Sequence, residues 1–369
     1  MFSTLLGGCW NTDTAALSND TVDFDPHAAE IDGWVVEGID VNLECPDGKN
    51  AVFYIVYPSD VPDSPQAAAV VYHSGSFDFV TGPTAEDPTA GAHYQDQDSR
   101  LGTSWAIHRV FVTLGMYPND DPYERHEGSL PYALADAGVP MLFPINCWGD
   151  YWHNRAGVVE NDFTGDLFYR NGRVAAEWGY RLLAEESFGI TQRIELPITV
   201  DPTKIYAVGL GEGARAIGEL ITIDDNLDGT PDFMPAAIAV DSVIDDLRVF
   251  YDNEAIYSET VQGLNRIFVD GKDATQEGSL GSAPVLPNRT AYIYSSVDTL
   301  IPVGAHDQII ARLSAMPDAW VHDATLQRHV LLNGAEEVTL AKQVVEYLTS
   351  GTGPTDTSDT GDTGDTDAK

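Results

Sequence analysis

The segment Lys204–Ile221, KIYAVGLGEGARAIGELI, carries most of the information about the fold. Its first residues form a short apolar run that predicts a buried β-strand, and the residues after position 213 have the apolar spacing of an α-helix. Between them, glycines occupy positions 209, 211 and 213. Glycine at every second position predicts a sharp strand-to-helix turn in which the backbone passes close to its neighbours.

The rest of the chain alternates strands and helices around this segment. Two β-rich runs, GWVVEGIDVNLEC and AVFYIVYPSD, are joined by a turn containing Asp47 and Gly48, so the sheet is expected to begin antiparallel. Later apolar runs such as AAAVVYHSGS and PAAIAVDS are typical of strands buried on both faces, and predicted helices separate them. The predicted fold class is α/β: a mainly parallel twisted sheet with helices on both faces and antiparallel first strands.

The glycine turn and this order of elements resemble the α/β-hydrolase fold over about residues 33–348. Members of that family place a nucleophilic serine in the motif G-x-S-x-G at a strand-to-helix turn. The three glycines fall on the motif, so the resemblance puts Gly211 at the nucleophile position and leaves that position vacant. Shifting the frame by one residue would make Glu212 the nucleophile, but Leu210 would then occupy a position that requires a small residue.

The resemblance also implies the two other members of a catalytic triad. The segment YIYSSVDTLIPVGAH is similar to the family's acid-bearing loop, so Asp298 would orient the imidazole of the base. The segment LQRHVLLNGAEEV places His329 just ahead of the last helix, where the family has its base, and the chain order of the three positions is kept. His322 is the alternative base.

The segment YHSGSFDF resembles the family's oxyanion loop, whose backbone N–H groups stabilise a developing negative charge. The resemblance implies that this site is formed by Ser74, Gly75, Ser76 and the backbone N–H of Glu212.

A serine-type mechanism needs a nucleophile that the base can activate, and glycine supplies none. The leading hypothesis is therefore a protein of this fold that lacks serine-hydrolase activity and acts as a ligand-binding or scaffold protein. The alternative is an active hydrolase of esters or peptides that uses another nucleophile or a water activated by His329. A purely structural surface module is a third hypothesis. The side chains that could replace the missing serine are Ser74, Ser76, Cys147 and Ser242.

The segment DDNLDGTPD has oxygen-bearing residues at alternate positions and glycine at the sixth position of the pattern. Such spacing suits a calcium loop, because glycine permits the sharp wrap around the ion. A polar turn between a helix and a strand would have a similar composition. We expect a structural calcium ion here and no organic cofactor elsewhere. Its ligands would be Asp224, Asn226, Asp228, Thr230 and Asp232.

The segment NCWGDYWHN follows a predicted buried strand, and ligands in open α/β sheets bind at the carboxyl ends of the strands. Its aromatic rings could stack on a sugar or cover an acyl group, or they could simply pack beneath the neighbouring insertion. The predicted ligand-contacting residues are Trp148, Tyr151, Trp152 and His153.

The chain has 58 acidic and 19 basic residues, a net charge of −39. A field of this sign repels nucleic acid and anionic membrane surfaces. The organised domain is expected at 33–349, with an insertion at 81–127 and a cap-like stretch at 242–288. Residues 10–32 are predicted to form a linker and 350–369 a disordered acidic tail.

Residues 1–9 end in Leu-Gly-Gly-Cys, which resembles the lipobox of bacterial lipoproteins. The resemblance implies an exported protein whose contact with a membrane is a lipid anchor on Cys9. In an exported protein Cys45 and Cys147 could pair, and their spacing does not decide whether they do.

Overall fold

The computed structural model describes residues 28–31, 33–44, 50–73, 130–144, 176–184, 196–210, 213–224, 227–242, 268–269, 272–273, 280–281, 283–298, 304, 306–325, 332 and 338–351.

Within the described residues, one nine-stranded sheet runs through the molecule in the order β1-β2-β3-β5-β4-β6-β7-β10-β11. The pairings from β1 to β3, and that of β3 with β5, are antiparallel, and the pairings from β5 to β11 are parallel. The predicted fold class is therefore confirmed. The strands are β1 Ala28–Ile31, β2 Trp34–Glu44, β3 Asn50–Pro58, β4 Gln66–His73, β5 Met141–Phe143, β6 Val200–Leu210, β7 Ala237–Asp241, β10 Thr290–Tyr294 and β11 Trp320–Asp323.

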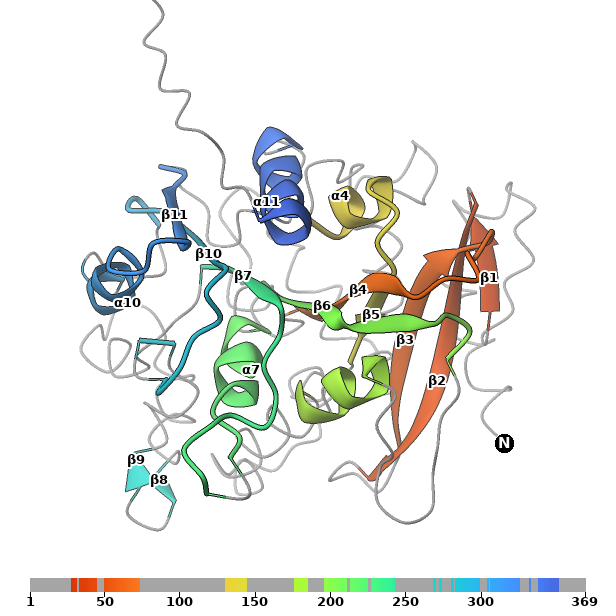
Figure 1. Ribbon diagram of the computed structural model, residues 1–369, viewed down its shortest axis with the longest axis horizontal. Helices are drawn as coiled ribbons and strands as arrows, with labels where there is room; N and C mark the ends of the chain where they lie inside the picture. Colours follow the sequence, from red (N-terminus) through yellow and green to blue (C-terminus); the bar gives the residue numbers. More distant parts are fainter. Residues whose placement is uncertain are drawn as a thin grey trace, which may run out of the picture.

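Helices cover both faces of the sheet (Figure 1). Helices α4 and α11 pack together on one face, while α7 and a helical segment at 176–183 lie on the other. Helix α10 packs its buried side chains into the same core as α7. The helices are α4 Leu130–Asp136, α7 Gly213–Leu220, α10 Asp307–Leu313 and α11 Val338–Ser350.

The alternation of side chains along the central strands builds a separate core on each face. In β4, Ala68, Val70 and Tyr72 point to the face covered by α7. Ala69 and Val71 point to the face covered by α4 and α11. Successive side chains of a strand point to opposite faces, so a strand covered on both sides needs an unbroken apolar run. This is why AAAVVY carries no polar alternation.

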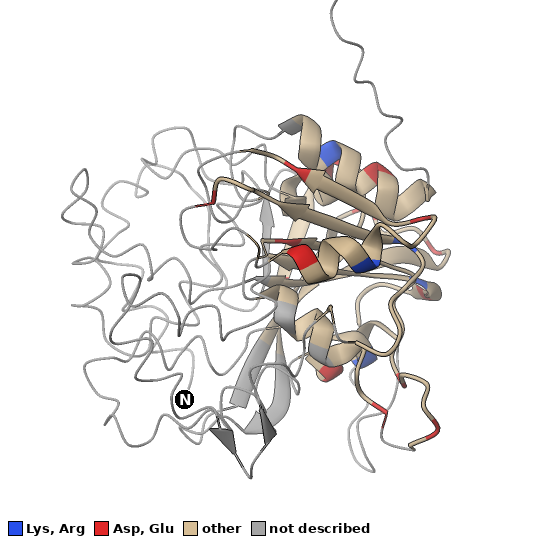
Figure 2. Cartoon of the chain, turned by 90° about the vertical axis from the view of Figure 1, so that its left-hand side faces the viewer, with Lys and Arg blue, Asp and Glu red and all other residues tan. Residues whose placement is uncertain are grey.

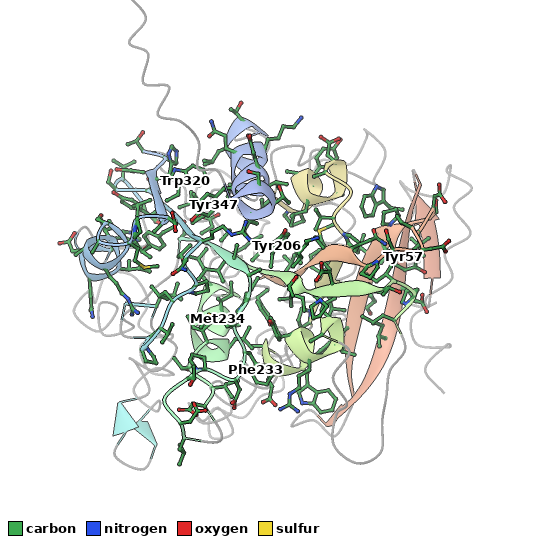
Figure 3. The ribbon with its side chains drawn as sticks, viewed as in Figure 1. Tyr57, Tyr206, Phe233, Met234, Trp320 and Tyr347 are labelled. Carbon is green, nitrogen blue, oxygen red and sulfur yellow. The ribbon has the colours of Figure 1, made fainter. Side chains whose placement is uncertain are left out.

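The last strand is fastened to the last helix by aromatic side chains (Figure 3). The rings of Trp320 in β11 and Tyr347 in α11 lie 5.8 Å apart. The Tyr347 hydroxyl donates a hydrogen bond to the carbonyl of Asp318, just ahead of β11. The guanidinium of Arg289, just ahead of β10, donates to the carbonyl of Leu348 at 3.1 Å. These contacts fix the end of α11 beside the sheet.

Several elements differ from the sequence-based expectation. Strand β1 lies within 10–32, where a linker is predicted, and Ile31 pairs with Trp34 across a turn at Gly33. Gly33 has φ +82°, a left-handed conformation that glycine adopts without strain. Strand β11 and helix α10 were not among the predicted elements. Within the predicted cap-like stretch, β8 Phe268–Val269 and β9 Lys272–Asp273 form a small antiparallel pair.

Figure 2 marks in red the acidic residues on the helices and loops around the sheet. In the part of the chain that the structure describes, no helix is both long and apolar enough to cross a bilayer.

Candidate functional site

The predicted site residues follow three neighbouring parallel strands. His73, the last residue of β4, is in register with Leu210, the last residue of β6. Leu210 is in register with Asp241, the last residue of β7. The three strands therefore end at the same edge of the sheet. The predicted oxyanion segment and the glycine turn accordingly begin on adjacent strands.

The junction between β6 and α7 is too tight for any side chain at Gly209. A Cβ atom there would lie 2.4 Å from the Cα of Ala214, 2.7 Å from its nitrogen and 2.9 Å from the carbonyl oxygen of Gly213. All three are backbone atoms, so no side-chain rotation relieves the contact. In the motif G-x-S-x-G, the first glycine allows the strand and the helix to approach this closely, and Gly209 stands at that position.

Only two residues, Gly211 and Glu212, separate the end of β6 from the start of α7. Leu210 is buried in the core on the opposite face of the sheet from α7. A frame shifted to Glu212 would require Leu210 to take the place against α7 that Gly209 occupies. Gly211 itself lies outside the described residues, so its role as a vacant nucleophile position stays a prediction.

Asp298 lies in a turn that follows β10. Its backbone N–H donates to the carbonyl of Ser295 at 3.2 Å, and the side chain is partly exposed. The carboxylate of Asp323, at the end of β11, accepts a hydrogen bond from the backbone N–H of Ser296 at 3.0 Å. The turn that carries the predicted triad acid is thus tied to the neighbouring strand.

Asp323 is an acidic group of this edge that the sequence analysis did not single out. Burial opposes its ionisation, but hydrogen bonds from Ser296 and from the backbone of Thr325, together with the nearby His322, outweigh burial and lower the pKa of the Asp323 carboxyl. The carboxylate form is therefore the one that holds the Asp298 turn.

His322, the alternative base, lies within β11 and is in register with Ile293. Its ring packs against that of Trp320, with the centroids 5.8 Å apart. This contact gives His322 a packing role in the edge strand. His329, the preferred base, lies outside the described residues.

Ser242 and Asp241 form a buried polar pair at the end of β7, and both side chains are fully buried. The Ser242 hydroxyl donates to Asp241 Oδ1 at 2.7 Å. Because this hydroxyl is buried and engaged with Asp241, Ser242 is poorly presented as a substitute nucleophile. Asp241 was not singled out from the sequence. A charged residue that ends the apolar run PAAIAVD is the signal that could have identified it.

The predicted calcium loop is partly described. Asp224 accepts backbone hydrogen bonds from Asp228 at 3.1 Å through one carboxylate oxygen and from Gly229 at 2.8 Å through the other. The backbone N–H of Thr230 donates to the Asp228 carboxylate at 2.8 Å. These bonds hold the backbone of the loop in a turn. Among the described residues, no group of three or more His, Cys, Asp or Glu side chains is arranged to hold a metal, so calcium stays a prediction.

Several predicted residues lie outside the described part of the chain, and their roles stay predictions. They are Ser74, Gly75, Ser76, Glu212, Asn226, Trp148, Tyr151, Trp152 and His153, together with the three cysteines Cys9, Cys45 and Cys147.

The sheet order, the antiparallel first strands and the tight turn after β6 together define an α/β-hydrolase fold. No protein-family model matches the chain, and no curated protein matches it. The chain is similar to solved structures of hydrolases that share 11 to 15% sequence identity with it.

Two of the similar structures are covered almost completely by the match with this chain. MGS-M1, an α/β-hydrolase enzyme from a Medee basin deep-sea metagenome library, is 13% identical, with 86% of this chain and 98% of that chain covered and a TM-score of 0.45. Esterase 2 of Thermogutta terrifontis is 14% identical, with 88% and 98% covered and a TM-score of 0.45.

A puromycin-hydrolysing peptidase of Mycobacterium tuberculosis is 14% identical, with 85% of this chain and 39% of that chain covered and a TM-score of 0.45. The chain spans 35 to 39% of the length of peptidase structures that it matches, this one among them. The order and register of the strands, rather than these similarities, carry the assignment of the fold.

Proposed function

We propose that this chain is an exported α/β-hydrolase-fold protein without serine-hydrolase activity, and that it binds a ligand or serves as a scaffold at the cell surface. One observation carries the proposal. The turn between β6 and α7 contains only Gly211 and Glu212, and the close approach of Gly209 to Ala214 supports Gly211 as the residue at its tip.

The chemistry follows from what a glycine at that position lacks. Acyl transfer by the serine mechanism needs an oxygen that attacks the carbonyl carbon while the base removes its proton. A histidine and an aspartate without that oxygen can at best activate water. Removal of the nucleophile leaves about 10³- to 10⁴-fold acceleration over water in enzymes that retain the oxyanion hole. Such residual activity would not make the protein an efficient hydrolase.

A binding role is supported by what the predicted site retains. Asp298, the predicted triad acid, lies in a turn that Asp323 fastens, and this turn follows a strand whose neighbour β7 ends beside β6. The aromatic segment at 146–154 adds rings that can stack on a sugar or cover an acyl chain. We therefore propose a small-molecule, glycan or acyl ligand.

The location of the protein belongs to the same proposal. The resemblance of the segment ending at Cys9 to a lipobox supports export and a lipid anchor as the contact with a membrane. The net charge of −39 supports a partner other than nucleic acid. Mass spectrometry of the N-terminal peptide tests the anchor, because lipidation adds the mass of the acyl chains to Cys9.

The catalytic part of the proposal is tested with short p-nitrophenyl esters and a fluorophosphonate probe. The wild-type protein is expected to be unlabelled and to give no turnover above the Gly211→Ala variant. Gly211→Ser differs from Gly211→Ala by one hydroxyl oxygen, so probe labelling in the serine variant alone would support the frame. Wild-type turnover that is lost on His329→Ala would instead establish an active hydrolase with another nucleophile or an activated water.

A further inference from the structure

Asp241 occupies an unusual place for a carboxylate. Its side chain is fully buried at the carboxyl end of β7, in register with Leu210 at the end of β6. Oδ1 accepts a hydrogen bond from the Ser242 hydroxyl at 2.7 Å, and Oδ2 accepts one from the backbone N–H of Leu332 at 2.6 Å. The carboxyl group acts as an acceptor in both contacts. Burying it is costly unless such bonds compensate.

Leu332 is fixed at three points. Its N–H donates to Asp241, and its carbonyl accepts from the N–H of Leu130, the first residue of α4, at 2.8 Å. Its side chain is fully buried in the core between α4, α11 and the sheet. Leu332 belongs to the connection between β11 and α11, and His329 stands three residues before it in the sequence.

The backbone at Ser242, next to Asp241, adopts a strained conformation. Ser242 has φ +54°, a left-handed conformation that costs a residue with a side chain about 1–2 kcal/mol. Its N–H donates to the carbonyl of Ile293 in β10 at 2.9 Å. Strain of this kind persists where the surrounding structure over-determines the conformation, and it gathers at functional sites.

We propose that Asp241 is a positioning residue. Its carboxylate fastens Leu332, in the connection between β11 and α11, to the carboxyl end of β7 beside the end of β6, and we expect this anchor to influence His329, three residues earlier in the sequence. Asp241 acts through the backbone of that connection. The proposal goes beyond the proposed function, because it holds whether or not the site hydrolyses an ester.

Asp323 provides a matched control. It too is a carboxylate at the carboxyl end of a strand, and it too accepts two backbone hydrogen bonds, from Ser296 and from Thr325. Its bonds hold the turn that carries Asp298 rather than the connection that carries His329. Removing it should release different amides.

The experiment is amide hydrogen exchange by NMR on the full chain, with Asp241→Ala, Asp241→Asn and Asp323→Ala. In Asp241→Ala the Leu332 amide is expected to exchange about 10- to 100-fold faster, the factor of a hydrogen bond to a charged group. Asp241→Asn keeps an acceptor for Leu332 and can donate to Ser242, so it is expected to restore protection. Asp323→Ala is expected to release Ser296 and Thr325 and to leave Leu332 unchanged.

A spectroscopic readout separates positioning from general stability. The imidazole resonances of His329 are expected to shift in Asp241→Ala and to return in Asp241→Asn, while those of His322 in β11 stay in place. Unchanged His329 resonances in a folded Asp241→Ala variant would overturn the proposal. So would release of Leu332 in Asp241→Asn as large as in Asp241→Ala.

The wild-type protein decides the matter if Asp241→Ala does not fold. A Leu332 amide that exchanges as fast as the exposed amides of the wild type would overturn the proposal. Protection in both the wild type and Asp241→Asn would support it. None of these readouts measures hydrolysis, so the result is independent of the test of the proposed function.

Discussion

Adding a single methyl group at Gly209 is the sharpest perturbation of the β6–α7 junction. In Gly209→Ala the new Cβ would lie 2.4 Å from the Cα of Ala214, so the junction would have to open by about 1 Å to reach an ordinary contact of 3.4 Å. Ala214 and Ile217 of α7 are fully buried, so the helix cannot shift without disturbing the core. Overpacking costs about 1–3 kcal/mol, and a backbone clash belongs at the upper end of that range. At about 2–4 °C for each kcal/mol, the melting temperature should fall by about 6–12 °C.

Gly179→Ala is the control for this measurement. Gly179 lies in the helical segment 176–183, and a Cβ there would meet Pro144 Cγ at 2.5 Å and Val70 Cγ2 at 3.0 Å. The Pro144 ring can relieve part of the contact by changing its pucker, whereas the buried Val70 side chain has little room to move. Alanine also gains about 1 kcal/mol over glycine within a helix, which offsets part of the cost. Gly179→Ala should therefore cost clearly less in urea unfolding and thermal melts. If Gly209→Ala is no more destabilising than Gly179→Ala, the turn is not tight, and the frame that places Gly211 at its tip is wrong.

Three further predictions concern the same edge and the acidic loop. Ser242→Gly is expected to be more stable than Ser242→Ala by about 1 kcal/mol in urea unfolding, because both lose the hydroxyl but only glycine relieves the φ of +54°; equal stabilities would contradict strain at this residue. Because the pKa of Asp323 is lowered in the folded state, its stabilisation is present above the ordinary value of 3.8 and is lost as pH falls through the lowered pKa. The wild type should thus be more stable than Asp323→Asn at pH 6, with the two converging near pH 2, and a constant difference would refute the reasoning. A chelator is expected to lower the melting temperature of the wild type and not that of Asp224→Ala; an unmoved wild-type value would count against calcium.

The sequence predicted the architecture well, because the central strands are buried on both faces. Runs such as AAAVVY and AAIAVD are typical of a covered parallel strand, and Gly209 marks a place where a helix starts against the strand it follows. Two of the strands that were missed show why the prediction was incomplete. Strand β11, WVHD, is a partly exposed edge strand with polar residues, so its apolar pattern is weak. Strand β1 was assigned to a linker, although Asp32-Gly33 is a hairpin signal.

The candidate site was predicted less completely than the fold. Asp298 could be placed because it follows a strong strand, TAYIY, in a turn-rich segment. The partners of the site, Asp241 and Asp323, could not, because their roles depend on hydrogen bonds to backbone groups of distant segments. The charged residue that ends PAAIAVD could have drawn attention to Asp241, but nothing local in the sequence identifies its partner Leu332, 91 residues further along.

The long reach of the bonds at Leu332 has a consequence for the folding pathway. Bringing Asp241 and Leu130 to the same residue closes long loops, and contacts of that kind form after local ones. We therefore expect the bonds that join Asp241, Leu332 and Leu130 to be largely unformed in the transition state for folding. Loosening them should shorten the lifetime of the native state by speeding unfolding, while the rate of refolding stays nearly constant.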